Sequence, residues 1–164
     1  MQTINKRRSV RSYLDKEVEE EKLLAVLEAG RLAPSARNRQ EWHFYVLTNK
    51  ELKEKLMALS RDQEMIVQAP ICIVVTATDQ YIMGCNIPAY VVDPTLALGY
   101  MLLEAQEQGL GTCWIGSYDQ EKIKELLNIP ESETVIGFTP LGYPDGAVRE
   151  RTYKTLDEIV TYIK

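Results

Sequence analysis

Four short segments of the sequence carry more hydrogen-bonding side chains than a turn or a helix end requires. The first is KRRSVRSY at 6–13, in which Arg7, Arg8, Ser9 and Arg11 form a dense set of donors. A guanidinium group stays charged and presents a planar fork that suits a phosphate or the carbonyl-rich edge of a ring. The plainer interpretation is the solvated, basic end of an N-terminal helix, and this segment taken alone favours it.

The second segment, APSARNRQEWHFYV at 33–46, joins an apolar helical pattern to an apolar strand pattern. Its candidate ligand-binding residues are Pro34, Ser35, Asn38 and Gln40. Amide groups both donate and accept hydrogen bonds, so they suit a heteroaromatic edge that carries carbonyls and ring nitrogens. The alternative is a loop whose polar groups satisfy its own backbone, and the segment alone does not decide between the two.

The third segment is GLGTCWIGS at 109–117, with Trp114, Ile115 and Gly116 as the candidates. Glycines allow a backbone to approach a ligand closely, and N–H groups exposed there can point at it. Taken alone, the segment favours a different interpretation, in which Gly109 is a helix C-cap and Trp114 and Ile115 belong to the core.

The fourth segment, AVRERTYK at 147–154, places Arg149 and Arg151 two residues apart. In an extended chain these two side chains face the same way, so together they could bind a phosphate. A solvated run of charges is the commoner explanation of such a segment.

Other kinds of chemistry find little support in the sequence. His43 is the only histidine, and its place beside Trp42 at the start of a strand favours a structural role over a catalytic triad. No glycine-rich dinucleotide or P-loop motif is present, and no residues have metal-ligand spacing, so we expect no metal. Abundant recognition groups with few acids, bases or nucleophiles indicate a cofactor that carries the chemistry.

The elements that position these segments follow from the apolar periodicity. We expect one α+β domain over 1–164, with a sheet of a few strands flanked by helices. Helices are predicted at 2–8, 18–32, 50–60 and 119–127, strands at 43–48, 71–77 and 134–144, an extended segment at 112–117, and an element of uncertain type at 157–164. Asp93 and Pro94 predict the start of a helix that runs to about residue 108. Its early turns are apolar nearly all round, which places it deep in a core or against a second chain.

Charge and composition limit the partners and the location. The 164 residues carry a net charge of −5, which argues against a nucleic-acid partner. The N-terminus is charged where a signal peptide would be apolar, and the longest apolar run is too short to cross a membrane. Three cysteines without a paired motif favour no disulfide framework, so we expect a reducing cytoplasm.

Taken together and in this order, the four segments resemble the motifs of the nitroreductase family of FMN-dependent, NAD(P)H-using oxidoreductases. RRSVRSY resembles its first flavin motif, PSARNRQEWHFYV its second, and DPTLALGYMLLEAQEQGLGTCWIG its interface helix with the segment at the flavin edge. PLGYPDGAVRERTYKTLDEIV resembles its C-terminal block. The resemblance covers essentially the whole chain.

The resemblance implies an interlocked homodimer with a small mixed or antiparallel sheet, and FMN bound at the dimer interface. Arg7, Arg8, Ser9 and Arg11 would contact the flavin, Pro34, Ser35, Asn38 and Gln40 would reach it from the partner chain, Trp114, Ile115 and Gly116 would line its ring, and Arg149 and Arg151 would hold its phosphate. The reactive centre would be the flavin N5, so the resemblance implies no catalytic side chain.

The implied reaction is ping-pong transfer of hydride from NADH or NADPH to a nitroaromatic, a quinone or a similar small acceptor. Two alternatives remain: a specialised relative, such as a reductive dehalogenase or an enzyme that degrades its own flavin, and a flavin-binding dimer without turnover. Glu41 stands where the family usually has proline, and its charge could disfavour anionic acceptors. The stretch 79–92 is short, and we expect it to shape an open pocket.

Overall fold

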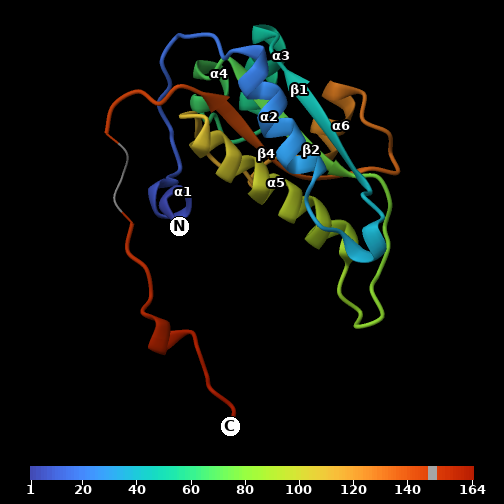
Figure 1. Cartoon of the computed structure of the whole chain (residues 1–164). Helices are drawn as coiled ribbons and strands as arrows, with labels where there is room; N and C mark the ends of the chain where they lie inside the picture. The colour runs from blue at the N-terminus through green and yellow to red at the C-terminus, as the bar shows by residue number, and fades with distance from the viewer. Residues whose placement is uncertain (148–150) are drawn as a thin grey trace.

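A four-stranded antiparallel sheet forms the centre of the molecule (Figure 1). The structure is a computed structural model and describes residues 1–147 and 151–164. The strands lie in the order β1 (Trp42–Leu47), β2 (Ile71–Ala77), β4 (Thr134–Gly142) and β3 (Gly111–Thr112). Every residue of β2 is buried, as expected for an apolar, β-branched strand covered on both faces. The prediction of a central strand at 71–77 is confirmed.

Helices cover both faces of the sheet, because successive side chains of β2 point to opposite sides. Ile71, Ile73 and Val75 pack with α2 (Glu20–Arg31) and α5 (Ala89–Glu107) on one face. Cys72 and Val74 pack on the other face with α3 (Lys50–Ala58), α4 (Met65–Gln68) and α6 (Gln120–Leu127). The short helix α4 was not expected from the sequence.

The long helix α5 differs from its prediction at the N-terminal end. It begins at Ala89 rather than after Asp93, so Pro94 lies inside the helix and Asp93 is not its N-cap. The Asp93 carboxylate instead accepts a hydrogen bond from the Ala36 N–H at 2.9 Å. Part of the stretch 79–92 is therefore helical, and the remaining loop is shorter than expected.

The N-terminal end of α6 follows its local signal. The Asp119 carboxylate accepts from the Lys122 N–H at 3.2 Å and caps α6, as predicted. The N-terminal helix α1 (Gln2–Lys6) is joined to the C-terminal end of α5 by a hydrogen bond from Thr3 to Glu107.

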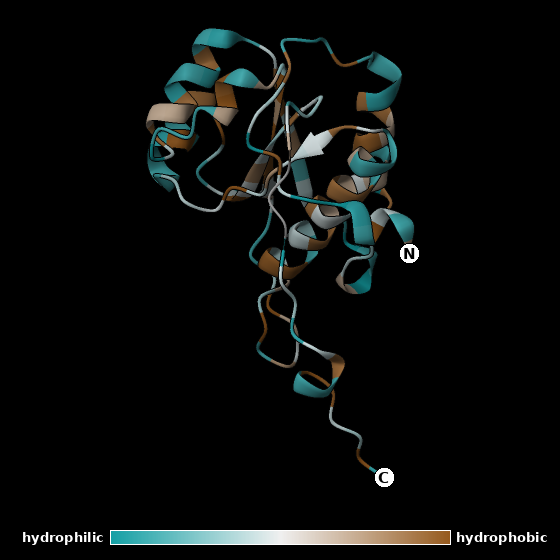
Figure 2. Ribbon diagram, turned by 90° about the vertical axis from the view of Figure 1, so that its left-hand side faces the viewer, coloured by the Kyte–Doolittle hydropathy of each residue, from teal (hydrophilic) through white to brown (hydrophobic). Residues whose placement is uncertain are grey.

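The chain ends in an arm that projects away from the helices and the sheet (Figures 1 and 2). Residues 151–164 are exposed throughout, and the expected terminal element is a single 3-10 turn at Leu156–Glu158. Several of its exposed side chains are large and apolar: Tyr153, Leu156, Ile159, Val160, Tyr162 and Ile163. Such a surface is unusual for an isolated domain and is typical of a segment that contacts a partner.

Candidate flavin-binding site

The first and fourth sequence segments meet in space. The Arg151 guanidinium donates a hydrogen bond to the Ser9 hydroxyl at 2.5 Å, although the two residues are 142 positions apart. Burial, followed by the charges of Arg151 and Arg8, lowers the pKa of Arg7. The cations therefore lie close enough to repel one another. A bound anion would reduce this repulsion. Arg149, predicted with Arg151, lies outside the described residues.

This arginine cluster (Arg7, Arg8, Arg11 and Arg151) is positioned by the edge of the sheet. Val10 donates its N–H to the Thr112 carbonyl at 2.8 Å, and Ser9 pairs with Thr112 in a parallel bridge. The close approach requires a glycine in β3, because a Cβ on Gly111 would lie 2.8 Å from Val10 Cβ. Beyond it, the Tyr13 hydroxyl donates to the Val10 carbonyl at 3.0 Å. The segment that carries the arginines is thus fixed to β3.

Two of the arginines also bind the nearby backbone. Arg8 Nη1 donates to the Arg7 carbonyl at 3.0 Å and to the Asn5 carbonyl, at the C-terminal end of α1. Arg11 Nη1 lies 3.4 Å from the Ser9 carbonyl. Each guanidinium has five N–H groups, so these contacts orient the side chains and leave donors for a ligand.

The predicted flavin-edge segment has two exposed residues around a buried one. Ile115 is 1% exposed, and its backbone exchanges hydrogen bonds with Phe138 at 2.8 and 3.2 Å. The structure therefore places Ile115 in the core. Trp114 and Gly116 are exposed on either side of it. Trp114 lies against Gly137, where an added Cβ would come within 3.0 Å of its Nε1.

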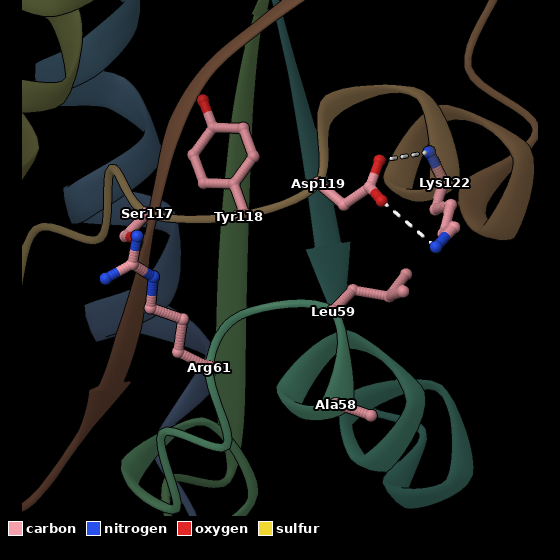
Figure 3. A pocket seen from close by; sticks show the side chains of 7 residues that line it. All are labelled: Ala58, Leu59, Arg61, Ser117, Tyr118, Asp119 and Lys122. Carbon is pink, nitrogen blue, oxygen red and sulfur yellow. Dashed lines mark hydrogen bonds and ion pairs between the residues drawn. The ribbon is translucent and has the colours of Figure 1, made fainter.

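A pocket continues from this segment toward the junction of α3 and α6 (Figure 3). Arg61 points toward Ser117, which directly follows Gly116 in the chain. On the far side, Asp119 pairs with the ammonium group of Lys122 at 3.2 Å. Arg61 and Asp62 have φ angles of 56° and 53°, a left-handed conformation that is uncommon outside glycine and asparagine. Sequence reasoning missed Arg61, because no local pattern predicts such a turn after α3.

In the second segment the polar side chains first hold the loop itself. The Ser35 hydroxyl accepts from the Gln40 N–H at 3.0 Å, and the Gln40 amide donates to the Asn38 carbonyl at 3.1 Å. These bonds support the interpretation in which the loop satisfies its own backbone, and ligand binding stays a prediction. Pro34, Asn38 and Gln40 remain exposed, and Ser35 is half-buried.

Within one chain the second segment lies far from the arginine cluster. Ala36 is attached to Asp93 near the start of α5, whereas α1, which precedes the arginines, is attached to Glu107 at its end. Fourteen residues of α-helix separate these attachments by about 21 Å. Figure 1 shows α1 and the loop before β1 at opposite ends of α5. One chain therefore does not bring the two parts of the predicted site together.

The structure defines an α+β protein with a cluster of arginines at the edge of its sheet, and comparison with known proteins gives the family. The sequence model of the Nitroreductase family matches residues 4–66 and 59–143. This chain belongs to the nitroreductase family, as its motifs predicted, and its fold is the nitroreductase fold. The described residues contain no helix that is long and apolar enough to cross a membrane.

The relatives span most of the chain. A candidate NADH dehydrogenase/NAD(P)H nitroreductase of Archaeoglobus fulgidus is 36% identical over 88% of this chain and 84% of its own length. The FMN reductase [NAD(P)H] of Bacillus subtilis is 27% identical over 100% and 78%. The crystal structure of a nitroreductase family protein from Clostridium novyi NT, 30% identical, aligns over 88% of this chain and 84% of that chain, with a TM-score of 0.83.

Proposed function

We propose that this protein is an FMN-dependent NAD(P)H oxidoreductase that reduces nitroaromatics, quinones or similar small acceptors. The observation that carries the proposal is the meeting of Arg7, Ser9 and Arg151 at the edge of the sheet. Within residues 1–147 and 151–164, no carboxylate lies within ion-pair distance of any arginine in the cluster. A cluster of guanidinium groups without a neighbouring carboxylate is suited to binding a phosphate.

The residues fit the parts of FMN. Arg7, Ser9 and Arg151 would hold the phosphate together with Arg149, while Arg8 and Arg11 would serve the ribityl chain and the polar edge of the ring. Trp114 and Gly116 present an exposed aromatic and an open backbone for the ring system. When bound, FMN would accept hydride from NADH or NADPH and pass it to the acceptor. The names of the relatives from A. fulgidus and B. subtilis support this assignment.

The site is completed by a second copy of the chain in this proposal. The loop of Pro34, Ser35, Asn38 and Gln40 lies about 21 Å along α5 from the arginine cluster, so it would reach the cofactor of the partner. Helix α5 carries apolar side chains on its outer face, where Leu96 and Tyr100, one turn apart, are 39% and 43% exposed. A two-fold interface along this face, with each C-terminal arm packed on the other chain, would cover the apolar side chains of α5 and of the arm.

The reaction would take place in the cytoplasm, where Cys72, Cys85 and Cys113 would stay unpaired.

The proposal is tested by the visible absorption spectrum after incubation with FMN and desalting. We expect flavin bands at about one FMN per chain, and NADH or NADPH consumption with a quinone. Arg151→Gln should retain at least tenfold less FMN, because a charge-assisted phosphate contact is lost. Arg31→Gln is the matched control, since Arg31 is exposed and paired with Glu28. A colourless wild-type protein, or equal loss in both variants, would contradict the proposal.

A further inference from the structure

Two neighbouring loops are tied into one surface, which we call the Tyr81 surface: Arg37, Arg39, Glu41, Asp79 and Tyr81. Arg39 forms an ion pair with Asp79, in which its Nε donates at 3.1 Å. The Thr78 hydroxyl donates to the Glu41 carboxylate at 2.8 Å, and its N–H donates to the Glu41 carbonyl at 3.2 Å. The loop before β1 and the loop after β2 therefore hold each other in place.

An aromatic ring lies beneath two guanidinium groups on this surface. The centre of the Tyr81 ring is 4.8 Å from the guanidinium carbon of Arg39 and 5.7 Å from that of Arg37. Both distances are within the range of cation–π attraction. The half-buried Tyr81 ring thus orients both guanidinium groups.

The two cations differ in their partners. Arg39 is paired with Asp79 and also lies 3.6 Å from Glu41. Arg39 therefore shares one positive charge between two carboxylates, one of them Glu41, whose charge the sequence suggested could disfavour anions. Arg37 has no carboxylate within ion-pair distance in the part of the chain that the structure describes. The free cation of this surface is Arg37, and it is exposed.

The backbone that presents Arg37 is strained. Arg37, Asn38 and Gln40 have φ angles of 56°, 54° and 56°, in the left-handed region that side chains other than glycine and asparagine rarely adopt. Strain of this kind persists where the surroundings impose it, and it is concentrated at ligand sites. Here the surroundings are the hydrogen bonds of Ser35 and the attachment of Ala36 to Asp93.

We propose that Arg37 binds the carboxylate or sulfonate of an aromatic electron acceptor, so that this protein prefers anionic acceptors to neutral ones. The inference rests on the proposed function, in which the loop that carries Arg37 reaches the cofactor site of the partner. Arg37 would offer its charge to the carboxylate or sulfonate, and Tyr81 would hold the Arg37 guanidinium in place over its own ring. A guanidinium without an acidic partner gives a carboxylate two donors in a fixed fork.

The first test is an equilibrium measurement that needs no turnover. Isothermal titration calorimetry of the FMN-loaded protein would compare benzoate with benzamide, which have nearly the same shape and differ in charge. We expect benzoate to bind more tightly than benzamide. Arg37→Gln should reduce the ratio of the two affinities by about three- to tenfold, the range between an exposed ion pair and a charge-assisted hydrogen bond. Arg37→Lys should keep most of the ratio.

The second test compares 4-nitrobenzoate with 4-nitrobenzamide as acceptors. In a ping-pong reaction kcat/KM for the acceptor does not depend on the reductant, so this value isolates the acceptor step. The anionic-to-neutral ratio of kcat/KM should fall in Arg37→Gln by the same factor as the affinity ratio. Arg31→Gln removes an equal charge from an arginine that is paired with Glu28 and should not change the ratio. Arg37→Asn is a second variant that tolerates the left-handed backbone.

The outcomes separate this inference from the function on which it rests. A protein that binds no FMN contradicts both. A loaded and active protein whose affinity and kcat/KM ratios are unchanged in both Arg37→Gln and Arg37→Asn contradicts the role of Arg37 alone. The same holds if only the kcat/KM for NADH or NADPH falls, because the arginine would then serve the reductant.

Discussion

Four of the arginines show two contrasting kinds of surroundings. Arg31 and Arg39 face carboxylates, which neutralise them where they stand. Arg7 and Arg151 instead lie beside other cations, and the pKa of Arg7 is lowered by burial and then by its neighbours. Paired arginines are explained by the fold alone, whereas gathered arginines need a further anion. This contrast is the reason for proposing an anion site at the gathered arginines.

Cysteine reactivity gives a prediction at the same scale. Cys72 is fully buried, and burial raises the pKa of its thiol to about 12, whereas Cys85 is exposed. Cys113 is also buried. The thiolate is the reactive form, so at pH 8 we expect an aromatic disulfide reagent to modify one thiol quickly in the native protein and three in urea. Cys85→Ser should abolish the fast reaction. A fast thiol that persists in the native variant would show that Cys72 or Cys113 is accessible, contrary to the structure.

The contact between β3 and the N-terminal segment gives a prediction at the scale of elements. Gly111→Ala would place a Cβ 2.8 Å from Val10 Cβ, which is branched and held between backbone hydrogen bonds. We expect the free energy of unfolding to fall by about 1–3 kcal/mol, as in other overpacked sites. FMN retention should fall as well, since Val10 adjoins the arginine cluster. Gly84→Ala, where no atom lies within 4 Å, is the control for chemical denaturation. Equal midpoints for the two variants would contradict the argument.

Elements with local signals were predictable, and those with distant causes were not. The strand at 71–77 is apolar on both faces, and the Asp119 cap acts within its own turn, so a short window contains the whole signal. Asp93 and Pro94 have the same local form as a helix start, but Asp93 binds Ala36, which is 57 positions away. A window around Asp93 contains no sign of that partner, so the start of α5 was placed too late.

The candidate site shows the same division. The types of Arg7, Ser9 and Arg151 indicated phosphate recognition, yet no spacing rule joins residues 142 positions apart. The order of the motifs along the chain matches that of the nitroreductase family, and this match indicated that Arg7, Ser9 and Arg151 belong to one site. Arg61 had no such help, because its orientation depends on two left-handed residues in a turn without glycine.

At the scale of the whole molecule, the proposed second copy would account for both α5 and the C-terminal arm. Leu98 and Met101, on the helix that the sequence placed against a partner, are fully buried within the chain. In the proposed dimer, α5 would instead offer its outer face, which carries Leu96 and Tyr100. The arm has no comparable cover, since Leu156, Ile159 and Tyr162 are 63–83% exposed. An exchange of arms would bury these side chains and bring the loop of Ser35 toward the arginine cluster of the other chain.

Removing the arm tests this arrangement. A chain that ends after Arg151 keeps the contact with Ser9 but loses every exposed apolar residue of the arm. We expect light scattering after size exclusion to show a weakened or absent dimer, and FMN retention to fall with it, because each site would lose its second half. The full-length variant Leu156→Ser with Ile159→Ser should show the same change to a smaller extent, as apolar burial of about 25 cal/mol per Å² is lost at two positions only. Leu24→Ser, on an exposed apolar residue of α2, is the control. A truncated protein that stays dimeric and yellow would show that the arm does not hold the two chains together.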